Sequence, residues 1–149
     1  MKKIASVAFA LILTACASKK EPTILSTTSN PIVSSKNYMP FVDVTEYSDN
    51  SKYGYSEKYP IKVGGVNELN GPSNQHRFLA SLAGPNGEEI RFHRRGSCCP
   101  YPSKNGFDGV GLLDVYEVTY EGLKKPILLY ITMYDKDKLY IPKDFTRAR

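Results

Sequence analysis

The sequence contains no tryptophan and only three cysteines, and it has no apolar run long enough to span a lipid bilayer. A spanning helix needs about 20 apolar residues, whereas the apolar run at residues 4–13 soon gives way to Ser18, Lys19, Lys20 and Glu21. The sequence therefore argues against a permanent transmembrane segment. A length of 149 residues fits one domain of ordinary size and argues against a two-domain enzyme.

The chain also lacks the patterns of the common catalytic sites. It has no G-x-S-x-G elbow, no H-E-x-x-H helix, no phosphate-binding loop and no paired-carboxylate pattern. The separated CxxC pairs typical of zinc sites are absent as well. The sequence therefore predicts no catalytic residue, no metal site and no cofactor, and it favours a non-enzymatic protein.

The first fifteen residues have the layout of a secretory signal peptide. Lys2 and Lys3 form a positive start, residues 4–13 are apolar, and a short exit follows. Loss of Lys2 and Lys3 with this segment lowers the formal charge from +5 to +3. Because an exported protein with this modest charge carries no recognition motif, we expect no nucleic-acid partner.

The residues Leu13-Thr14-Ala15-Cys16 resemble a bacterial lipobox. The resemblance implies a diacylglyceryl group on the Cys16 sulfur, cleavage after Ala15 and a fatty acyl group on the freed amine. Two or more acyl chains give stable anchoring, so we expect a membrane-bound lipoprotein of the bacterial envelope. Ala17, where an aspartate would resemble an inner-membrane retention signal, favours the outer membrane, facing the periplasm. The alternative is an ordinary signal peptide followed by an incidental cysteine.

The chain after the lipobox divides into a tether and a domain. Residues 17–37 are rich in Ser, Thr, Asn, Lys and Pro and keep no period, which predicts a flexible tether spanning roughly 25 Å. Residues 38–50 allow either a short strand or an extended arm. The predicted organisation is a signal peptide at 1–15, a lipidated cysteine with its tether at 16–51, and a compact domain at 52–149.

The domain pattern predicts an α+β fold, with a mainly antiparallel sheet of four to five strands and one helix packed on a face. Ser73 or Asn74 can cap the start of the helix, and Gly84 followed by Pro85 supplies its stop. Alternating or doubly apolar runs predict four strands, of which the last two form a hairpin: these strands are 59–63, 88–95, 112–120 and 127–134. The charged tail at 135–149 is expected to be irregular or a short terminal turn.

Adjacent Cys98 and Cys99 form the most unusual local feature. Their Cα atoms stand about 3.8 Å apart across a trans peptide, below the usual disulfide range, so a bond between them would be strained and readily reduced. The pair allows several interpretations: a rigid turn, two partly buried thiols, a redox-responsive or ligand-gripping disulfide, or a soft-metal site with His76 or His93. Cys98 with His93 as base is the one enzymatic alternative.

Two surface features are candidates for ligand binding. Arg91, His93 and Arg95 share the outward face of the strand at 88–95 and can bind an anion such as a phosphate or a glycan carboxylate; the alternative is a solvated face balanced by Glu88 and Glu89. The eleven tyrosines can offer an aromatic surface to carbohydrate or protein, or fill strands by propensity.

Several separated motifs resemble a family of small bacterial lipoproteins: YGYSEK and IKVGG, LASLAGPNG, GSCC and YEVTYEG, within the last hundred residues. The resemblance transfers no catalytic residue. Similar sequences are sometimes called 2-dehydro-3-deoxyphosphooctonate aldolases, but that enzyme resembles a TIM barrel, which needs about 250 residues. We therefore expect an envelope lipoprotein that binds an envelope protein or glycan, with a thiol redox or soft-metal role at Cys98 and Cys99 as the alternative.

Overall fold

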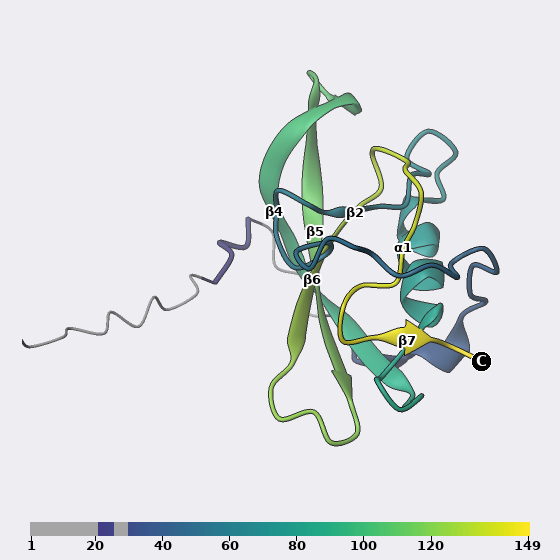
Figure 1. Ribbon diagram of the computed structural model, residues 1–149. Helices are drawn as coiled ribbons and strands as arrows, with labels where there is room; N and C mark the ends of the chain where they lie inside the picture. The colour runs from purple at the N-terminus through teal and green to yellow at the C-terminus, as the bar shows by residue number, and fades with distance from the viewer. Residues whose placement is uncertain (1–20, 26–29) are drawn as a thin grey trace, which may run out of the picture.

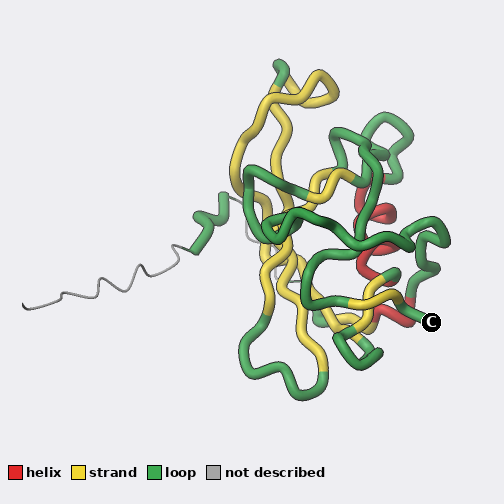
Figure 2. Tube along the Cα trace, in the orientation of Figure 1, coloured by secondary structure: helices red, strands yellow, loops and turns green. Residues whose placement is uncertain are grey.

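The computed structural model describes residues 21–25 and 30–149 of the chain. Within these residues the fold is α+β, as the sequence predicts, with one α-helix, a five-stranded mixed sheet and a two-stranded sheet (Figure 2). The spatial order of the large sheet is β1 (Val33–Ser34), β4 (Ile90–Phe107), β5 (Val110–Tyr120), β6 (Ile127–Thr132) and β2 (Ile61–Lys62). Among the strand pairs of this sheet that the described residues form, β2–β6 is parallel and the others are antiparallel.

The long β4–β5 hairpin extends beyond the rest of the sheet (Figure 1). The predicted strand at 88–95 corresponds only to the first part of β4, which continues through the cysteine pair to Phe107. Register shifts after Arg94, Cys98 and Pro102 place bulges along β4. These bulges absorb Pro100 and Pro102, because a residue without an N–H is tolerated where ladder pairing is interrupted.

The predicted hairpin of the last two strands is confirmed by the antiparallel pairing of β5 with β6, which runs from Val118–Ile127 to Asp114–Ile131. The predicted inner position of the doubly apolar strand is also confirmed, since β6 lies between β5 and β2. Of the predicted strand at 59–63, only Ile61 and Lys62 form a strand, β2, and Val63 forms one isolated bridge to Lys136.

Helix α1 (Gly71–Ala80) begins and ends earlier than the sequence predicts. Pro72 occupies its first turn, where a missing N–H costs nothing. Asn74, predicted as a cap, donates its side-chain amide to the Gly64 carbonyl instead. The helix ends at Ala80, and Ser81 is its C-cap, whose hydroxyl donates to the Arg77 carbonyl at 2.9 Å. Residues beyond it form β3 (Leu82–Ala83), which pairs with β7 (Thr146–Arg147), so the predicted stop at Gly84 is wrong.

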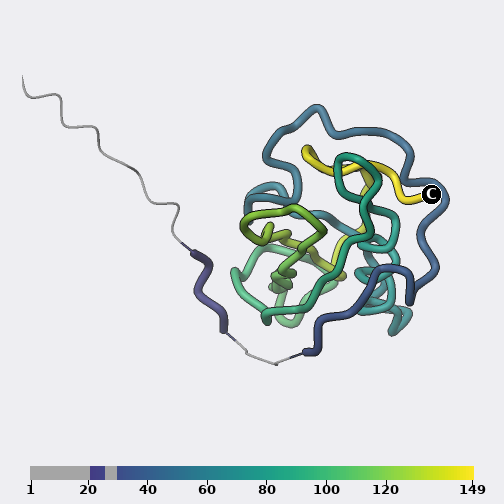
Figure 3. Tube along the Cα trace, turned by 90° about the horizontal axis from the view of Figure 1, so that it is seen from below, coloured from purple at the N-terminus to yellow at the C-terminus, as the bar shows by residue number. Residues whose placement is uncertain are grey.

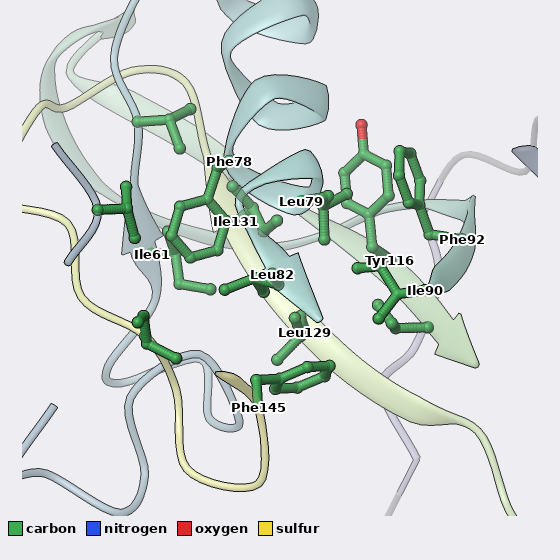
Figure 4. Packing of buried hydrophobic residues seen from close by; sticks show 14 residues of the cluster. Ile61, Phe78, Leu79, Leu82, Ile90, Phe92, Tyr116, Leu129, Ile131 and Phe145 are labelled. Atoms are coloured by element: carbon green, nitrogen blue, oxygen red, sulfur yellow. The ribbon is translucent and has the colours of Figure 1, made fainter. Parts of the chain in front are cut away.

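The main core lies between α1 and the large sheet (Figure 4). Phe78 and Leu79 of α1 are fully buried, and Ile90 and Phe92 of β4 are at most 1% exposed. Each such side chain contributes about 2 kcal/mol on burial. These side chains share one cluster with residues of the neighbouring strands and loops: Val44, Ile61, Val63, Leu82, Tyr116, Val118, Leu129, Ile131, Ile141 and Phe145.

Residues outside the predicted domain also belong to this body. Val33 and Ser34, expected in the flexible tether, pair with Phe92 and Arg91 along the outer edge of β4. Val44, expected in an undecided arm or strand, is fully buried. The unpaired edge of β4 offers backbone partners to any nearby segment, which explains why a polar segment lies against it.

The C-terminal tail is not merely irregular or a terminal turn. Ile141 and Phe145 are buried in the main core, and Ile141 forms a parallel bridge with Tyr47. Figure 3 shows this yellow segment lying beside the blue chain that precedes α1. In the described part of the chain, no helix is long and apolar enough to cross a membrane.

Candidate functional site

The cysteine pair lies at a bulge in the middle of β4. The Sγ atoms of Cys98 and Cys99 are bonded, and their Cα atoms are 3.7 Å apart. Cys98 is fully buried, whereas Cys99 is partly exposed and has a φ of +49°. A positive φ is uncommon for a residue with a side chain, so ring closure between neighbouring residues holds Cys99 in a conformation that it would otherwise rarely adopt.

A second, smaller cluster surrounds Cys98 on the sheet face opposite α1. Its buried members are Cys98, Leu113, Val115 and Tyr130. Ile24, from the described segment 21–25, packs against this cluster. Strand alternation explains the separation of the two clusters, because odd-numbered β5 residues face away from Tyr116 and Val118.

The segment 21–25 is bound to β4 at this place. The Leu25 amide donates to the Ser97 carbonyl at 2.8 Å, and the Arg95 guanidinium lies 3.5 Å from the Glu21 carboxylate. Arg95 is the additional residue at the bulge between Arg94 and Gly96. This part of the predicted tether therefore adds to the edge of the sheet beside the cysteine pair.

The predicted anion-binding row is divided by this bulge. Arg91 and His93 lie on one face, opposite Thr119 and Glu117 of β5, and Arg91 is exposed. Arg95 is displaced from their alternation and faces Glu21. Anion binding at Arg91, His93 and Arg95 stays a prediction.

A buried polar network lies on the opposite face of the same strands. Asp114 is 7% exposed and accepts hydrogen bonds from three side chains, two of β4 and one of α1. Its Oδ1 atom accepts from Ser97 Oγ at 2.8 Å and from Arg94 Nη2 at 2.7 Å, and its Oδ2 atom accepts from Gln75 Nε2 at 2.7 Å. The network ties α1, β4 and β5 together directly behind the cysteine pair.

Aromatic groups extend this network toward the surface. Tyr116 donates its hydroxyl to Gln75 Oε1 at 2.9 Å, and burial raises the pKa of Tyr116. His76 packs among the rings of Tyr38, Phe92 and Tyr116, with centroid distances of 4.6, 5.6 and 6.0 Å. Burial lowers the pKa of His76, because desolvation disfavours the imidazolium form.

Three further tyrosines are held by hydrogen bonds within the body. Tyr53 receives a hydrogen bond from the Tyr140 amide at 3.3 Å, and burial raises its pKa to about 12. Tyr55 donates its hydroxyl to the Lys143 carbonyl. Tyr101 is hydrogen-bonded to Thr132 at 2.8 Å. Tyr59 is 44% exposed, and a role of the tyrosines as an aromatic binding surface stays a prediction.

A polar cavity of about 350 Å³ lies between the start of α1 and the β4–β5 arm. Four asparagines line it from three segments: Asn67, Asn70, Asn74 and Asn105. The Asn67 amide donates to Asn105 Oδ1 at 3.4 Å, and the Asn105 amide donates to the Tyr134 carbonyl at 2.9 Å. Glu68 and Lys136 add one charge of each sign to the lining.

Two glycines shape the floor of this cavity. Gly64 and Gly65 have φ values of +68° and +103°, and a Cβ on Gly65 would lie 2.5 Å from Asn74 Nδ2. Glycine supplies both the left-handed backbone and the close approach. The IKVGG motif therefore ends β2 and positions the asparagine side chains.

Cys16 lies outside the described residues, so its lipidation stays a prediction. Among the residues that the structure describes, no group of three or more His, Cys, Asp or Glu side chains can hold a metal ion. Neither a family model, nor a curated protein, nor a solved structure matches this chain.

Sequence reasoning missed both the Asp114 network and the asparagine cavity. A signal for the network exists, because Asp114 is a charged residue in a strand whose neighbours Leu113, Val115 and Tyr116 are apolar or aromatic. The cavity gives no comparable signal, since Asn105 follows Asn67 by 38 residues and meets it only through folding.

Proposed function

We propose that this chain is a lipid-anchored, non-enzymatic binding module of the bacterial envelope, held at the outer membrane facing the periplasm through Cys16. The sequence supports the anchor through its signal peptide and lipobox. The ligand proposed for the module is an uncharged glycan segment bearing hydroxyl and acetamido groups.

The asparagine cavity carries this proposal. Side-chain amides offer both donors and acceptors, which match the hydroxyl and acetamido groups of sugars. Because Glu68 and Lys136 balance each other in charge, the cavity favours a neutral ligand over an anion. A small number of placed polar groups on a concave surface is the usual basis of ligand orientation.

Direct binding measurements test this function. The full chain, purified in detergent, is titrated with soluble oligomers of an N-acetylated amino sugar and, as a control polysaccharide, with dextran, which has no acetamido groups. We expect saturable binding to the acetamido sugar. Asn67→Ala combined with Asn70→Ala should weaken it about thirtyfold, since each of the two lost hydrogen bonds is worth about 1 kcal/mol. Asn86→Ala, an exposed asparagine outside the cavity lining, is the matched control and keeps wild-type affinity. Equal affinity for dextran, or no binding at all, contradicts the proposal.

The second candidate function is thiol redox or soft-metal chemistry at Cys98 and Cys99. The bonded sulfur atoms and the partial exposure of Cys99 favour its redox form. Intact mass with and without reductant separates the two states, because reduction adds two hydrogens. Permanently free thiols contradict the redox form, and a turnover lost on Cys99→Ser would contradict the non-enzymatic proposal.

A further inference from the structure

We propose that the Cys98–Cys99 disulfide is a redox modification site that controls the docking of residues 21–25 on the edge of β4. In the oxidised form the segment is docked, and in the reduced form it is released. This inference goes beyond the proposed function, because it needs neither a ligand in the asparagine cavity nor a lipid on Cys16.

The docked segment depends on backbone and side-chain positions next to the cysteine pair. The Leu25 amide is bonded to the carbonyl of Ser97, the residue directly before Cys98. Ile24 packs on the cluster that includes Cys98 and Cys99. The Glu21–Arg95 pair is exposed at Glu21, so it adds little to the docking.

The disulfide fixes the conformation on which this docking depends. Cys99 has a φ of +49° at the bulge between Cys98 and Tyr101. Without the bond between the sulfurs, Cys99 can return to a negative φ, which reorients the Cys98–Cys99 and Cys99–Pro100 peptide groups. Cys98, freed from the same ring, transmits the change to the Ser97–Cys98 peptide, which carries the carbonyl that Leu25 binds. Ser97 stays tied to Asp114 through its hydroxyl, so we expect the change to extend no further toward the start of β4 than the Ser97 carbonyl.

The chemistry of the switch is a two-electron thiol–disulfide exchange with a dithiol reductant. A thiolate of the dithiol attacks Sγ of Cys99, the accessible sulfur, and the bond to Cys98 breaks; the Cys98 thiolate then takes up a proton. The second thiolate of the dithiol displaces Cys99, which is protonated in turn. The protein gains two S–H groups, and the dithiol becomes a disulfide.

Release changes the reach of the chain when Cys16 is anchored, a consequence that rests on the proposed function. With residues 21–25 docked, five Cα-to-Cα steps lead from Cys16 to Glu21, and they span at most about 18 Å. With the segment released, the next paired residue is Val33, and the 17 intervening steps span at most about 60 Å. The redox state therefore sets how far the body can stand from the membrane.

Hydrogen exchange measured by mass spectrometry tests the release. The full chain is studied in detergent, oxidised and after reduction by dithiothreitol. We expect the peptide containing residues 21–25 to exchange at least about fivefold faster after reduction, while a peptide from α1 keeps its protection. Equal exchange of residues 21–25 in both states overturns the proposal.

A reciprocal measurement keeps the test decisive if reduction also loosens the core. By linkage, docking must favour the disulfide by the same factor by which the disulfide favours docking. Ile24→Asp is expected to undock the segment and leaves both cysteines in the sequence. It should therefore raise the reduced fraction of Cys98 and Cys99 at a fixed ratio of reduced to oxidised dithiothreitol. The reduced-to-oxidised ratio is expected to rise at least about fivefold, read by acid quenching, alkylation and mass mapping.

Ile32→Asp is the matched control, since Ile32 is 62% exposed and lies outside both buried clusters. It should leave the reduced fraction at the wild-type value. An unchanged reduced fraction in Ile24→Asp overturns the proposal whatever the exchange data show. Sugar binding is measured in a separate experiment. If the glycan proposal fails, the reduced fractions of the two variants still test the redox proposal.

Discussion

Asp114 is a carboxylate in the interior of the domain, and its neighbours make it tolerable there. Its side chain is 10% exposed and that of Arg94 is 20% exposed in their 2.7 Å ion pair. Three hydrogen-bonding side chains satisfy the two carboxylate oxygens. A buried ion pair costs much desolvation, so removing one partner is more damaging than replacing both.

Asp114→Ala should therefore lower the free energy of unfolding by about 3 kcal/mol, measured by urea denaturation. Glu46→Ala is the matched control, because Glu46 forms an ion pair of the same length, 2.7 Å, with Lys138. Both side chains of that pair are more than half exposed. That change should cost at most about 1 kcal/mol. Equal losses for the two variants would show that the network does not stabilise the fold.

His76 gives the domain a sensitivity to acid. Its folded-state pKa lies below the ordinary 6.5 because burial disfavours the charged ring. Between the folded and unfolded pKa values the unfolded chain binds more protons, so the free energy of unfolding falls as the pH drops through this range. We expect His76→Gln to flatten the fall in stability between pH 7.5 and about pH 5, followed by urea midpoints. The same slope in both proteins would contradict the assignment to His76.

At the scale of elements, Tyr101 links β4 to β6 by crossing over β5. Its hydroxyl reaches Thr132 of β6 at 2.8 Å, and Gly111 of β5 lies beneath the ring. A Cβ on Gly111 would lie 2.9 Å from Tyr101 Cε1 and 3.0 Å from the Tyr134 ring. Glycine is needed here for close approach, since no positive φ is involved.

Gly111→Ala should lower the free energy of unfolding by about 2 kcal/mol, because the two rings must move from packed positions. The measurement is a double-mutant cycle with Tyr101→Ala, which removes one of the two rings. We expect the alanine at position 111 to cost less in the Tyr101→Ala background. Strict additivity of the two changes would rule out the steric explanation.

The elements that the sequence predicts best are those set by local pattern. Alternation in β5 and the doubly apolar run of β6, joined by a glycine-containing connection, predict the hairpin correctly. The ends of α1 are missed because tertiary partners decide them: Ser81 accepts the Phe41 amide at 2.8 Å while its hydroxyl donates to Arg77. The length of β4 is hidden by its two prolines, which fall next to register shifts.

At the scale of the whole molecule, the body is larger than local patterns indicate. Val33, Ile141 and Phe145 stand singly or in apolar runs of at most three residues within polar segments, so no sustained period marks them. They become buried or paired only because the rest of the fold offers an open strand edge and a core to cover. The asparagine cavity has the same origin, since its lining comes from segments far apart in the chain.

The proposed anchor makes a prediction for the whole molecule. Cys16→Ser should leave an uncleaved, non-acylated precursor, since the hydroxyl replaces the thiol that would carry the diacylglyceryl group. Intact mass and detergent phase partition measure the change. Each buried methylene contributes about 0.8 kcal/mol, so loss of the acyl chains should lower the fraction of the protein in the detergent phase. The apolar signal segment stays on the uncleaved precursor and keeps part of it in that phase.

The control is the double variant Cys98→Ser, Cys99→Ser, which removes the other two thiols. It should keep wild-type processing and wild-type mass of the lipid group. A Cys16→Ser protein that is still cleaved after Ala15 and still carries acyl mass would contradict the lipoprotein proposal, because no other residue of the lipobox offers a sulfur.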